Sequence, residues 1–377
     1  MVAQGLQLVE GNDVSEPSPN LHTVFATLAD EGLIEADWPT RVAAVVATET
    51  AAQPWFIRVI TGLGAWIASL MLFAAVAIVG LATTWIFLLL GLLLIVGSVK
   101  FRRVSEHDLA RQFALATSLT GQLSFIWGVF SLTKSIEMSM LTLVGLQVVL
   151  IIMFHDPIHR FLSVLFTTGA VFMLLYHWEI RSLLPVLAVG LAGAFTWLQL
   201  NEATYNRRAE GKRIRSVAYG LLGASLGTVM LSTVYILPEL ISSDFTFYPH
   251  PWVSTVGFGV ILLYLWHHLI IQPAGLSASR AWLIYLFMVV MIAASWPAPG
   301  VILSLVIILL GFGHAHRVLI GIGLAFFTVF VGAYFYGMEV TLLTKSMTLI
   351  LTGVAILALR QVIAKVLPKD NGQVDHA

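Results

Sequence analysis

From Trp55 to about Val366 the chain is almost continuously apolar, and this feature restricts its fold more than any other. Clusters of charged residues, proline or glycine interrupt the run at intervals close to the roughly 20 residues that a membrane-spanning helix needs. In lipid the backbone must satisfy its own hydrogen bonds, and helices of this length do so. We therefore predict an all-α, polytopic integral membrane bundle of about 12 transmembrane helices, near residues 57–79, 82–99, 109–132, 138–154, 157–178, 183–201, 215–237, 252–271, 279–296, 299–314, 318–337 and 345–366.

The basic residues give an independent prediction of orientation, because lysine and arginine accumulate on the cytoplasmic side of a membrane protein. With the N-terminus inside, seventeen of the twenty Lys and Arg fall on the inner side, and Lys134, Arg181 and Lys345 fall outside. A miscounted span in the middle would mix the two sets. The sequence thus predicts that both termini are cytoplasmic (N-in/C-in).

The segments that flank the apolar run have a different composition. Residues 1–54 hold eight acidic residues against Arg41 and show neither the basic start nor the apolar run of a signal peptide. Helical spacing from Leu21 to Gly32, and a second start at Asp37, predict two short helices. We therefore expect a cytoplasmic N-terminal tail (1–54), a transmembrane helical domain (55–366) and a cytoplasmic C-terminal tail (367–377).

Composition and motifs exclude several classes of function. The net charge of zero gives no bulk attraction to nucleic acid, and the absence of cysteine excludes disulfides and thiolate metal sites. No acidic residue lies near the middle of a predicted span, which argues against a relay of buried carboxylates. The chain has no phosphate-binding loop, zinc-protease helix, serine elbow or dinucleotide fingerprint. We expect no enzymatic activity, no catalytic residue, no metal and no cofactor.

Histidines gather at the inner ends of the predicted spans. Such a set raises the possibility of a metal, haem or quinone site, but histidine also suits the headgroup region of a bilayer, and we favour that structural interpretation. The residues are His107, His155, His159, His267, His268, His314 and His316.

Two glutamines are the notable polar residues at mid-membrane depth. Gln122 and Gln147 lie near the centres of the third and fourth spans, which a short turn joins as antiparallel neighbours. We predict that the two amides bond to each other or share one solute. The third span also carries a stripe of small residues that favours close helix packing, at Ala110, Ala114, Thr117, Gly121, Ser124, Gly128 and Ser131.

Aromatic and charged residues mark two places on the predicted outer face. Phe245, Phe247 and Tyr248 lie in the one sizeable outer loop, at 238–251, and can rest on the membrane or contact a partner. At the turn after the eleventh span, we predict either an ion pair within a tyrosine belt or a docking site for a periplasmic partner. Its residues are Tyr334, Tyr336, Glu339 and Lys345.

Three stretches of the chain carry a resemblance, and they read QPWFIRVITGLGAW at 53–66, QFALATSLTGQ at 112–122 and YFYGMEVTLLTKS at 334–346. These stretches resemble a bacterial inner-membrane family filed as domain of unknown function forty-four-zero-one. The resemblance covers nearly the whole chain and implies a multi-pass protein of the bacterial inner (cytoplasmic) membrane. It implies no activity, and often a neighbouring gene for a membrane-associated GDYxxLxY protein.

Two functions fit these features. A permease-like bundle for a small solute or lipid fits the number of spans, and it predicts a polar cavity around Gln122 and Gln147. A non-transporting protein of membrane assembly or envelope maintenance, working with a periplasmic or membrane partner, fits the lack of buried charge. That second function predicts a filled core and a binding patch on the outer face.

Overall fold

The computed structural model describes residues 21–32, 37–40, 55–80, 84–104, 108–154, 156–206, 211–233, 250–273, 278–296 and 298–337, with residues 343, 346, 347 and 350. The chain divides into two units, residues 1–64 and 65–377. In the first unit, α1 (Leu21–Asp30) is followed by a turn at Gly32, whose φ of 70° is a conformation that favours glycine. Phe25 of α1 stacks on Trp38 at 5.4 Å between ring centroids. The first predicted short helix is confirmed. Of the second, residues 38–40 are helical, and the residues that follow lie outside the described ranges.

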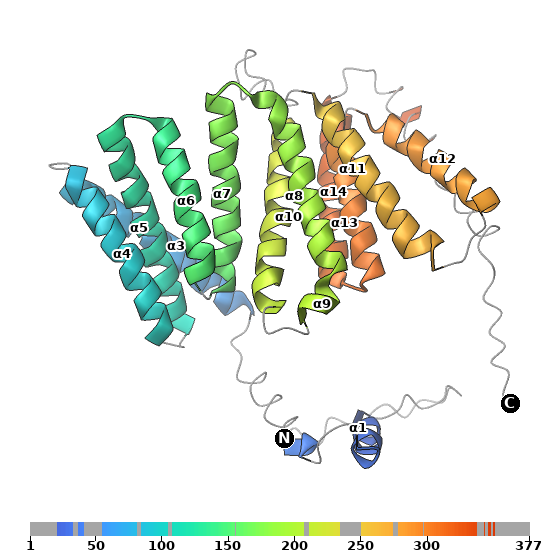
Figure 1. Cartoon of the computed structure of the whole chain (residues 1–377), viewed down its shortest axis with the longest axis horizontal. Coiled ribbons are helices and arrows are strands. Elements are labelled where there is room, and N and C mark those ends of the chain that lie inside the picture. The colour runs from blue at the N-terminus through green and yellow to red at the C-terminus, as the bar shows by residue number, and fades with distance from the viewer. Residues whose placement is uncertain are drawn as a thin grey trace. The chain divides into compact units, whose positions relative to one another are not determined.

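Helix α3 (Trp55–Gly80) runs from the first unit into the second, and the second unit is a set of helices that lie side by side (Figure 1). These are α4 (Thr84–Val104), α5 (Asp108–Thr133), α6 (Ile136–Met153), α7 (Pro157–His177), η1 (Arg181–Leu183), α8 (Leu184–Leu200), α9 (Glu202–Asn206), α10 (Gly211–Thr233), α11 (Pro251–Trp266), the π-helical η3 (His267–Ile271), α12 (Ala278–Ala294), α13 (Pro299–Gly313) and α14 (Arg317–Gly337). Within the described ranges there is no strand, which confirms the all-α prediction.

The apolar helices follow the predicted spans closely. In the part of the chain that the structure describes, eight helical segments are long and apolar enough to cross a membrane. Two shorter apolar stretches, Ile284–Ala293 and Pro299–Gly313, coincide with the ninth and tenth predicted spans. The last predicted span, 345–366, lies almost wholly outside the described residues. The protein is therefore a membrane-embedded helical protein.

Local sequence explains where several helices begin. Asp156 caps α7, since its Oδ1 accepts hydrogen bonds from the backbone N–H of Ile158 at 2.9 Å and of His159 at 3.2 Å. Pro157 follows at the first helical position, where proline costs no hydrogen bond. The same chemistry starts α6, where the Ser135 hydroxyl accepts from the backbone N–H of Met138. The predicted start of α7 is thus confirmed.

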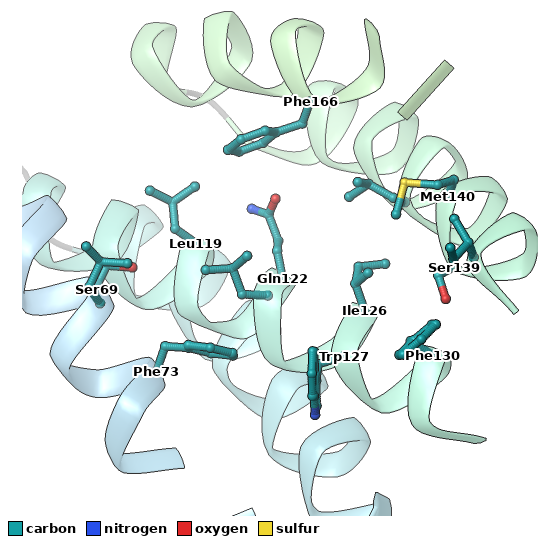
Figure 2. Close-up of a pocket in the computed structure, with 14 residues that line it drawn as sticks. Ser69, Phe73, Leu119, Gln122, Ile126, Trp127, Phe130, Ser139, Met140 and Phe166 are labelled. Carbon is teal, nitrogen blue, oxygen red and sulfur yellow. The ribbon is translucent and has the colours of Figure 1, made fainter. Parts of the chain in front are cut away.

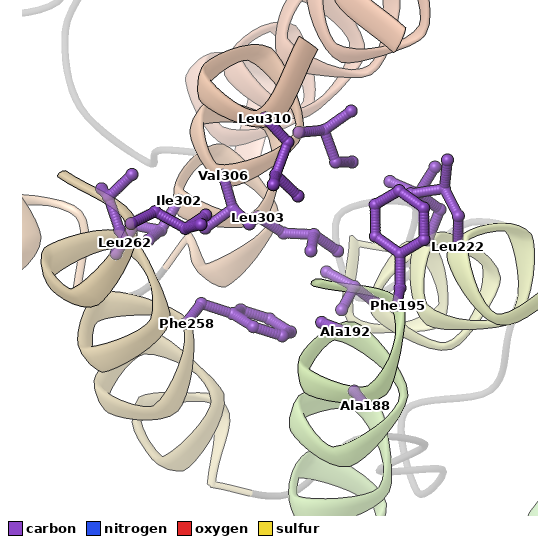
Figure 3. Packing of buried hydrophobic residues seen from close by; sticks show 14 of the residues in the cluster. Ala188, Ala192, Phe195, Leu222, Phe258, Leu262, Ile302, Leu303, Val306 and Leu310 are labelled. Atoms are coloured by element: carbon purple, nitrogen blue, oxygen red, sulfur yellow. The ribbon is translucent and has the colours of Figure 1, made fainter. Parts of the chain in front are cut away.

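The main hydrophobic core joins helices that are distant in sequence. Helix α10 packs on both α7 and α8, α8 packs on α11, and α11 packs on α13, which pairs with α14. Phe195, Phe258 and Leu303, from α8, α11 and α13, are almost completely buried where these helices meet (Figure 3). This core holds the second half of the chain together.

Helices α4 and α5 approach each other more closely than ordinary side chains allow. A Cβ atom on Gly121 would lie 2.8 Å from the carbonyl oxygen of Gly91 and 2.9 Å from the backbone nitrogen of Ile95. A Cβ atom on Gly91 would lie 2.6 Å from the backbone nitrogen of Phe125. The predicted role of the small-residue stripe in close packing is confirmed at Gly121 and Gly128, and Gly91 of α4 is its partner.

Candidate functional site

A cavity of about 550 Å³ lies in the second unit between α3, α5, α6 and α7 (Figure 2). Helix α5 contributes the largest share of the lining, through side chains that recur at helical spacing. The lining residues are Ser69, Leu70 and Phe73 of α3, Leu119, Gln122, Leu123, Ile126, Trp127 and Phe130 of α5, Ile136, Ser139, Met140 and Leu143 of α6, and Phe166 of α7. Apart from Ser69, Gln122 and Ser139, these side chains are apolar or aromatic.

The cavity is elongated along α5 and partly open. From Leu119 to Phe130 the lining covers about 16 Å of helix at 1.5 Å per residue. Four of the lining side chains, Leu70, Leu123, Trp127 and Ile136, are also exposed at the surface of the unit. The opening therefore faces the surroundings of the apolar helices, where lipid would lie.

A buried polar network borders the cavity at Gln122, where the lining side chains of Ser69, Leu119 and Gln122 are buried. The side-chain amide of Gln147 donates a hydrogen bond of 2.7 Å to Oε1 of Gln122, so the predicted contact between the two amides is present. The amide nitrogen of Gln122 donates to Ser118 Oγ at 3.0 Å and contacts His159 Nε2 at 3.2 Å. Ser118 Oγ also lies 2.9 Å from His159 Nε2. The network thus joins α5, α6 and α7.

The partners of His159 determine its tautomer. An amide NH₂ group only donates, so His159 Nε2 accepts from Gln122 and Ser118, and the ring proton lies on Nδ1. Nδ1 then donates to Ser163 Oγ at 3.2 Å. The imidazole ring stacks on Phe154 at 4.0 Å between centroids. His159 is only 1% exposed, and the ring is held as a neutral bridge between α5 and α7.

The beginning of α7 carries a second group of buried polar residues. Asp156 Oδ2 lies 3.6 Å from Arg102 Nε, while its other carboxylate oxygen caps α7. Arg160 is buried and donates from Nε to the carbonyl oxygen of Ile151 at 3.2 Å. These contacts connect α4, α6 and α7 at one end of the helices.

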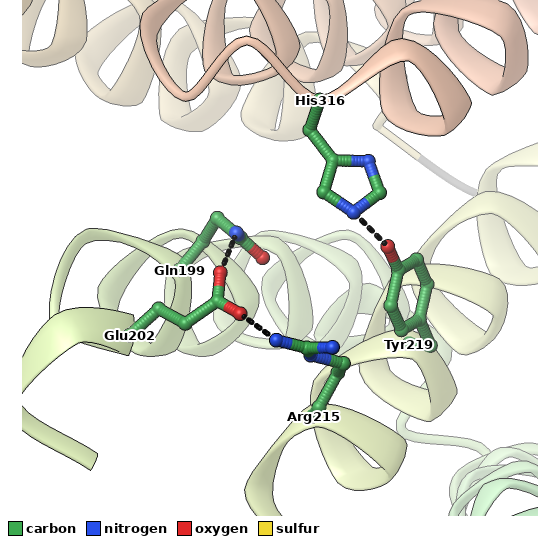
Figure 4. A network of polar contacts seen from close by, with 5 residues as sticks. All are labelled: Gln199, Glu202, Arg215, Tyr219 and His316. Atoms are coloured by element: carbon green, nitrogen blue, oxygen red, sulfur yellow. Dashed lines mark hydrogen bonds and ion pairs between the residues drawn. The ribbon is translucent and has the colours of Figure 1, made fainter. Parts of the chain in front are cut away.

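A further polar cluster connects α8, α9, α10 and the start of α14 (Figure 4). The carboxylate of Glu202 accepts from Gln199 at 2.6 Å and from Arg215 at 2.7 Å. The Tyr219 hydroxyl lies 3.2 Å from His316 Nε2. Glu202 thus joins Gln199 to Arg215, and Tyr219 separately joins α10 to His316, so we interpret both groups as structural contacts between helices.

The histidines are distributed differently from the grouping suggested by the sequence. His107 and His155 lie outside the residues whose side chains the structure describes. His267 bonds to the Tyr285 hydroxyl at 2.7 Å, and His268 stacks on Tyr264. Among the described residues, no three His, Asp or Glu side chains are grouped so as to hold a metal ion.

Most of the predicted outer-face residues lie outside the part of the chain that the structure describes. Phe245, Phe247, Tyr248, Glu339 and Lys345 lie beyond the described residues. Tyr334 is partly buried on α14, and Tyr336 belongs to the same helix, but its side chain is not described. The predicted ion pair and the docking site therefore stay predictions.

Two expectations about the centre of the protein need correction. The permease interpretation predicted a polar cavity around Gln122 and Gln147, and the alternative predicted a filled core. The structure has a cavity, and it is mostly apolar, because Gln147 bonds to Gln122 and Gln122 also contacts His159. His159 was assigned to the headgroup region, yet it is buried in the network. The sequence signal that was missed is a pair of polar residues four apart on each of two helices: Ser118 with Gln122, and His159 with Ser163.

Comparison with known proteins identifies a family but no characterised relative. A family model described as a domain of unknown function (DUF4401) matches residues 54–366. No curated protein and no solved structure matches the chain.

Proposed function

This chain belongs to the DUF4401 family, and we propose that it is a permease-like membrane protein whose substrate is a lipidic molecule. The observation that carries the proposal is the apolar cavity between α3, α5, α6 and α7. Its volume falls within the roughly 300–1,000 Å³ of small-molecule sites. A hydrophilic solute would lose its hydration there and find few polar partners, whereas a hydrocarbon chain loses nothing on entering.

The proposal includes the membrane arrangement predicted from the sequence. We propose about 12 spans, cytoplasmic termini and, from the family resemblance, the inner membrane of a bacterium. Because the chain has no cysteine of its own, Ala209→Cys and Ser243→Cys each provide a single label site. We expect an impermeant thiol reagent, added to cells with a permeabilised outer membrane, to label Ser243→Cys and to spare Ala209→Cys. The reverse pattern would overturn the orientation.

Filling the cavity tests the proposed substrate. Leu123 lines the cavity and is 47% exposed, while Leu92 of α4 is 48% exposed and does not line it, so the two leucines form a matched pair. We expect Leu123→Trp to reduce photo-crosslinking of a phospholipid with a diazirine in one acyl chain by about tenfold. Such a loss corresponds to about 1.4 kcal/mol of binding free energy. Leu92→Trp should behave as the wild type, with the full chain reconstituted in vesicles in all cases.

A measurement of lipid movement between leaflets distinguishes a permease from a protein that only binds lipid. In the same vesicles, a fluorescent phospholipid should cross the bilayer faster with the wild-type protein than without protein, and Leu123→Trp should remove the difference. Equal rates with and without the protein would refute transport. The alternative, a non-transporting assembly or envelope-maintenance protein with a partner such as a GDYxxLxY protein, would then account for the lipid site. Of the outer-face residues on which that alternative depends, Tyr334 is described on α14, while Phe245, Phe247, Tyr248, Glu339 and Lys345 lie outside the described residues.

A further inference from the structure

The hydrogen bonds of the cavity lining determine which part of a lipid it can accept. Both amide hydrogens of Gln122 are used, one by Ser118 and one by His159. Ser139 donates its hydroxyl hydrogen to the carbonyl oxygen of Ser135 at 2.8 Å. Because Thr120 Oγ1 donates to the Ser69 carbonyl oxygen, the Ser69 hydroxyl hydrogen is left to bond Thr120 Oγ1 at 3.0 Å. None of these three polar side chains offers a hydrogen to a ligand.

The remaining side-chain donor of the lining belongs to Trp127 and faces away from the buried lining at Gln122. The indole nitrogen of Trp127 points away from Gln122 (Figure 2). A carboxylate or phosphate buried near Gln122 would therefore lack any donor and would pay its full desolvation cost. The part of the cavity at Gln122 consequently accepts hydrocarbon and excludes an anionic headgroup.

The depth of the cavity agrees with a chain that enters from one leaflet. Its lining extends about 16 Å along α5, and one leaflet supplies about half of the roughly 30 Å hydrocarbon core. Phe130 and Ile136 place the other end of the lining beside the turn between α5 and α6. A lipid with its chain end at Gln122 would carry its headgroup to that turn.

Lys134 occupies this turn. It follows Phe130 by four residues, and its backbone N–H still bonds the Phe130 carbonyl oxygen at 2.8 Å. Its φ of 52° is left-handed, so Lys134 ends α5 directly beyond the last lining residue of that helix. Its side chain is exposed, and among the described residues it has no ion pair. The nearby carboxylate of Glu137 accepts a hydrogen bond from Trp178 Nε1 at 3.0 Å. Lys134 is thus a cation at the level where a lipid phosphate would lie.

We propose that the occupant is a phospholipid of the leaflet at the α5–α6 turn, with one acyl chain in the cavity and its phosphate against Lys134. This inference rests on the proposed lipid substrate and adds the headgroup class and the direction of entry. A lysine near the membrane surface contributes about 1 kcal/mol to binding an anionic group, which is about a fivefold change in affinity.

The test compares two diazirine probes that differ only in the headgroup. Full-length protein in phosphatidylcholine vesicles is exposed to diazirine-labelled phosphatidylglycerol or to diacylglycerol with the same chains, and the labelled peptides of α5 and α6 are quantified. We expect Lys134→Gln to lower phosphatidylglycerol labelling about fivefold, to leave diacylglycerol labelling unchanged, and Lys134→Arg to retain both. Lys100 is an exposed lysine near the C-terminal end of α4, away from the α5–α6 turn, and Lys100→Gln is therefore the matched control. Adding inorganic phosphate should not reduce labelling, because the phosphate is recognised as part of a lipid.

The outcomes separate the two proposals. Equal labelling by both probes, unaffected by Lys134→Gln, would overturn the headgroup inference and leave the lipid cavity intact. Competition by inorganic phosphate would overturn the lipid source of the phosphate. If neither probe labels α5 or α6, and Leu123→Trp changes nothing, the lipid substrate itself is refuted.

Discussion

Replacing Gly121 with leucine is expected to lower the free energy of unfolding by about 3 kcal/mol, as overpacking of a tight interface does. The atoms that a side chain would meet belong to the backbone of α4, namely the carbonyl oxygen of Gly91 and the nitrogen of Ile95, both within 3 Å of the added Cβ. Backbone atoms cannot move aside as the end of a flexible side chain can. The two helices must separate, and they lose the contacts that depend on their close approach.

Unfolding in mixed micelles with increasing SDS measures this loss. Gly97→Leu on α4 is the control, since a Cβ at Gly97 has no neighbour within 4 Å, and we expect a change below about 0.5 kcal/mol. Gly121→Ala should fall between the two leucine variants. If Gly121→Leu and Gly97→Leu unfold at the same SDS fraction, the close packing of α4 on α5 is wrong.

The second large effect is expected at the amide pair. Gln122→Leu removes contacts with Ser118, Gln147 and His159 and should cost about 2 kcal/mol. Gln147→Leu should cost less, about 1 kcal/mol, because Gln147 Oε1 has no hydrogen-bond partner in the part of the chain that is described, and one bond is lost. The double variant should cost less than the two together, because the same hydrogen bond is removed by either change.

The same SDS titration, applied to both single variants and the double variant, gives the coupling free energy. Gln272→Leu is the control for a glutamine that is exposed after η3, and its effect should be within about 0.5 kcal/mol of zero. Strictly additive losses for Gln122 and Gln147 would contradict the pairing.

Much of the fold could be predicted from hydropathy and short-range chemistry. The apolar run, the cap at Asp156 and Pro157, and the small residues around Gly121 each act within one helix or one hairpin. The contact of Gln122 with Gln147 also follows from a short turn, because α5 and α6 are joined by residues 134 and 135 alone.

The cavity could not be predicted, because it depends on helices that are far apart in sequence. Ser69 and Phe73 of α3, and Phe166 of α7, line the same cavity as the α5 residues only because of the tertiary arrangement. Helix α10 also packs against α7, although α8 and α9 separate the two helices in the chain, so this contact could not be predicted either. For His159, the position near a span end favoured the headgroup region, while the actual burial comes from Phe154 and the polar side chains that surround it.

The most direct test is a cryo-EM map of the full chain in lipid nanodiscs. The account predicts elongated density beside Leu119, Leu123 and Ile126 that begins near Gln122 and continues to the turn at Lys134. A cavity filled by inward movement of α3 onto α6, or one that holds no density while ordered lipid is seen elsewhere on the protein, would contradict it.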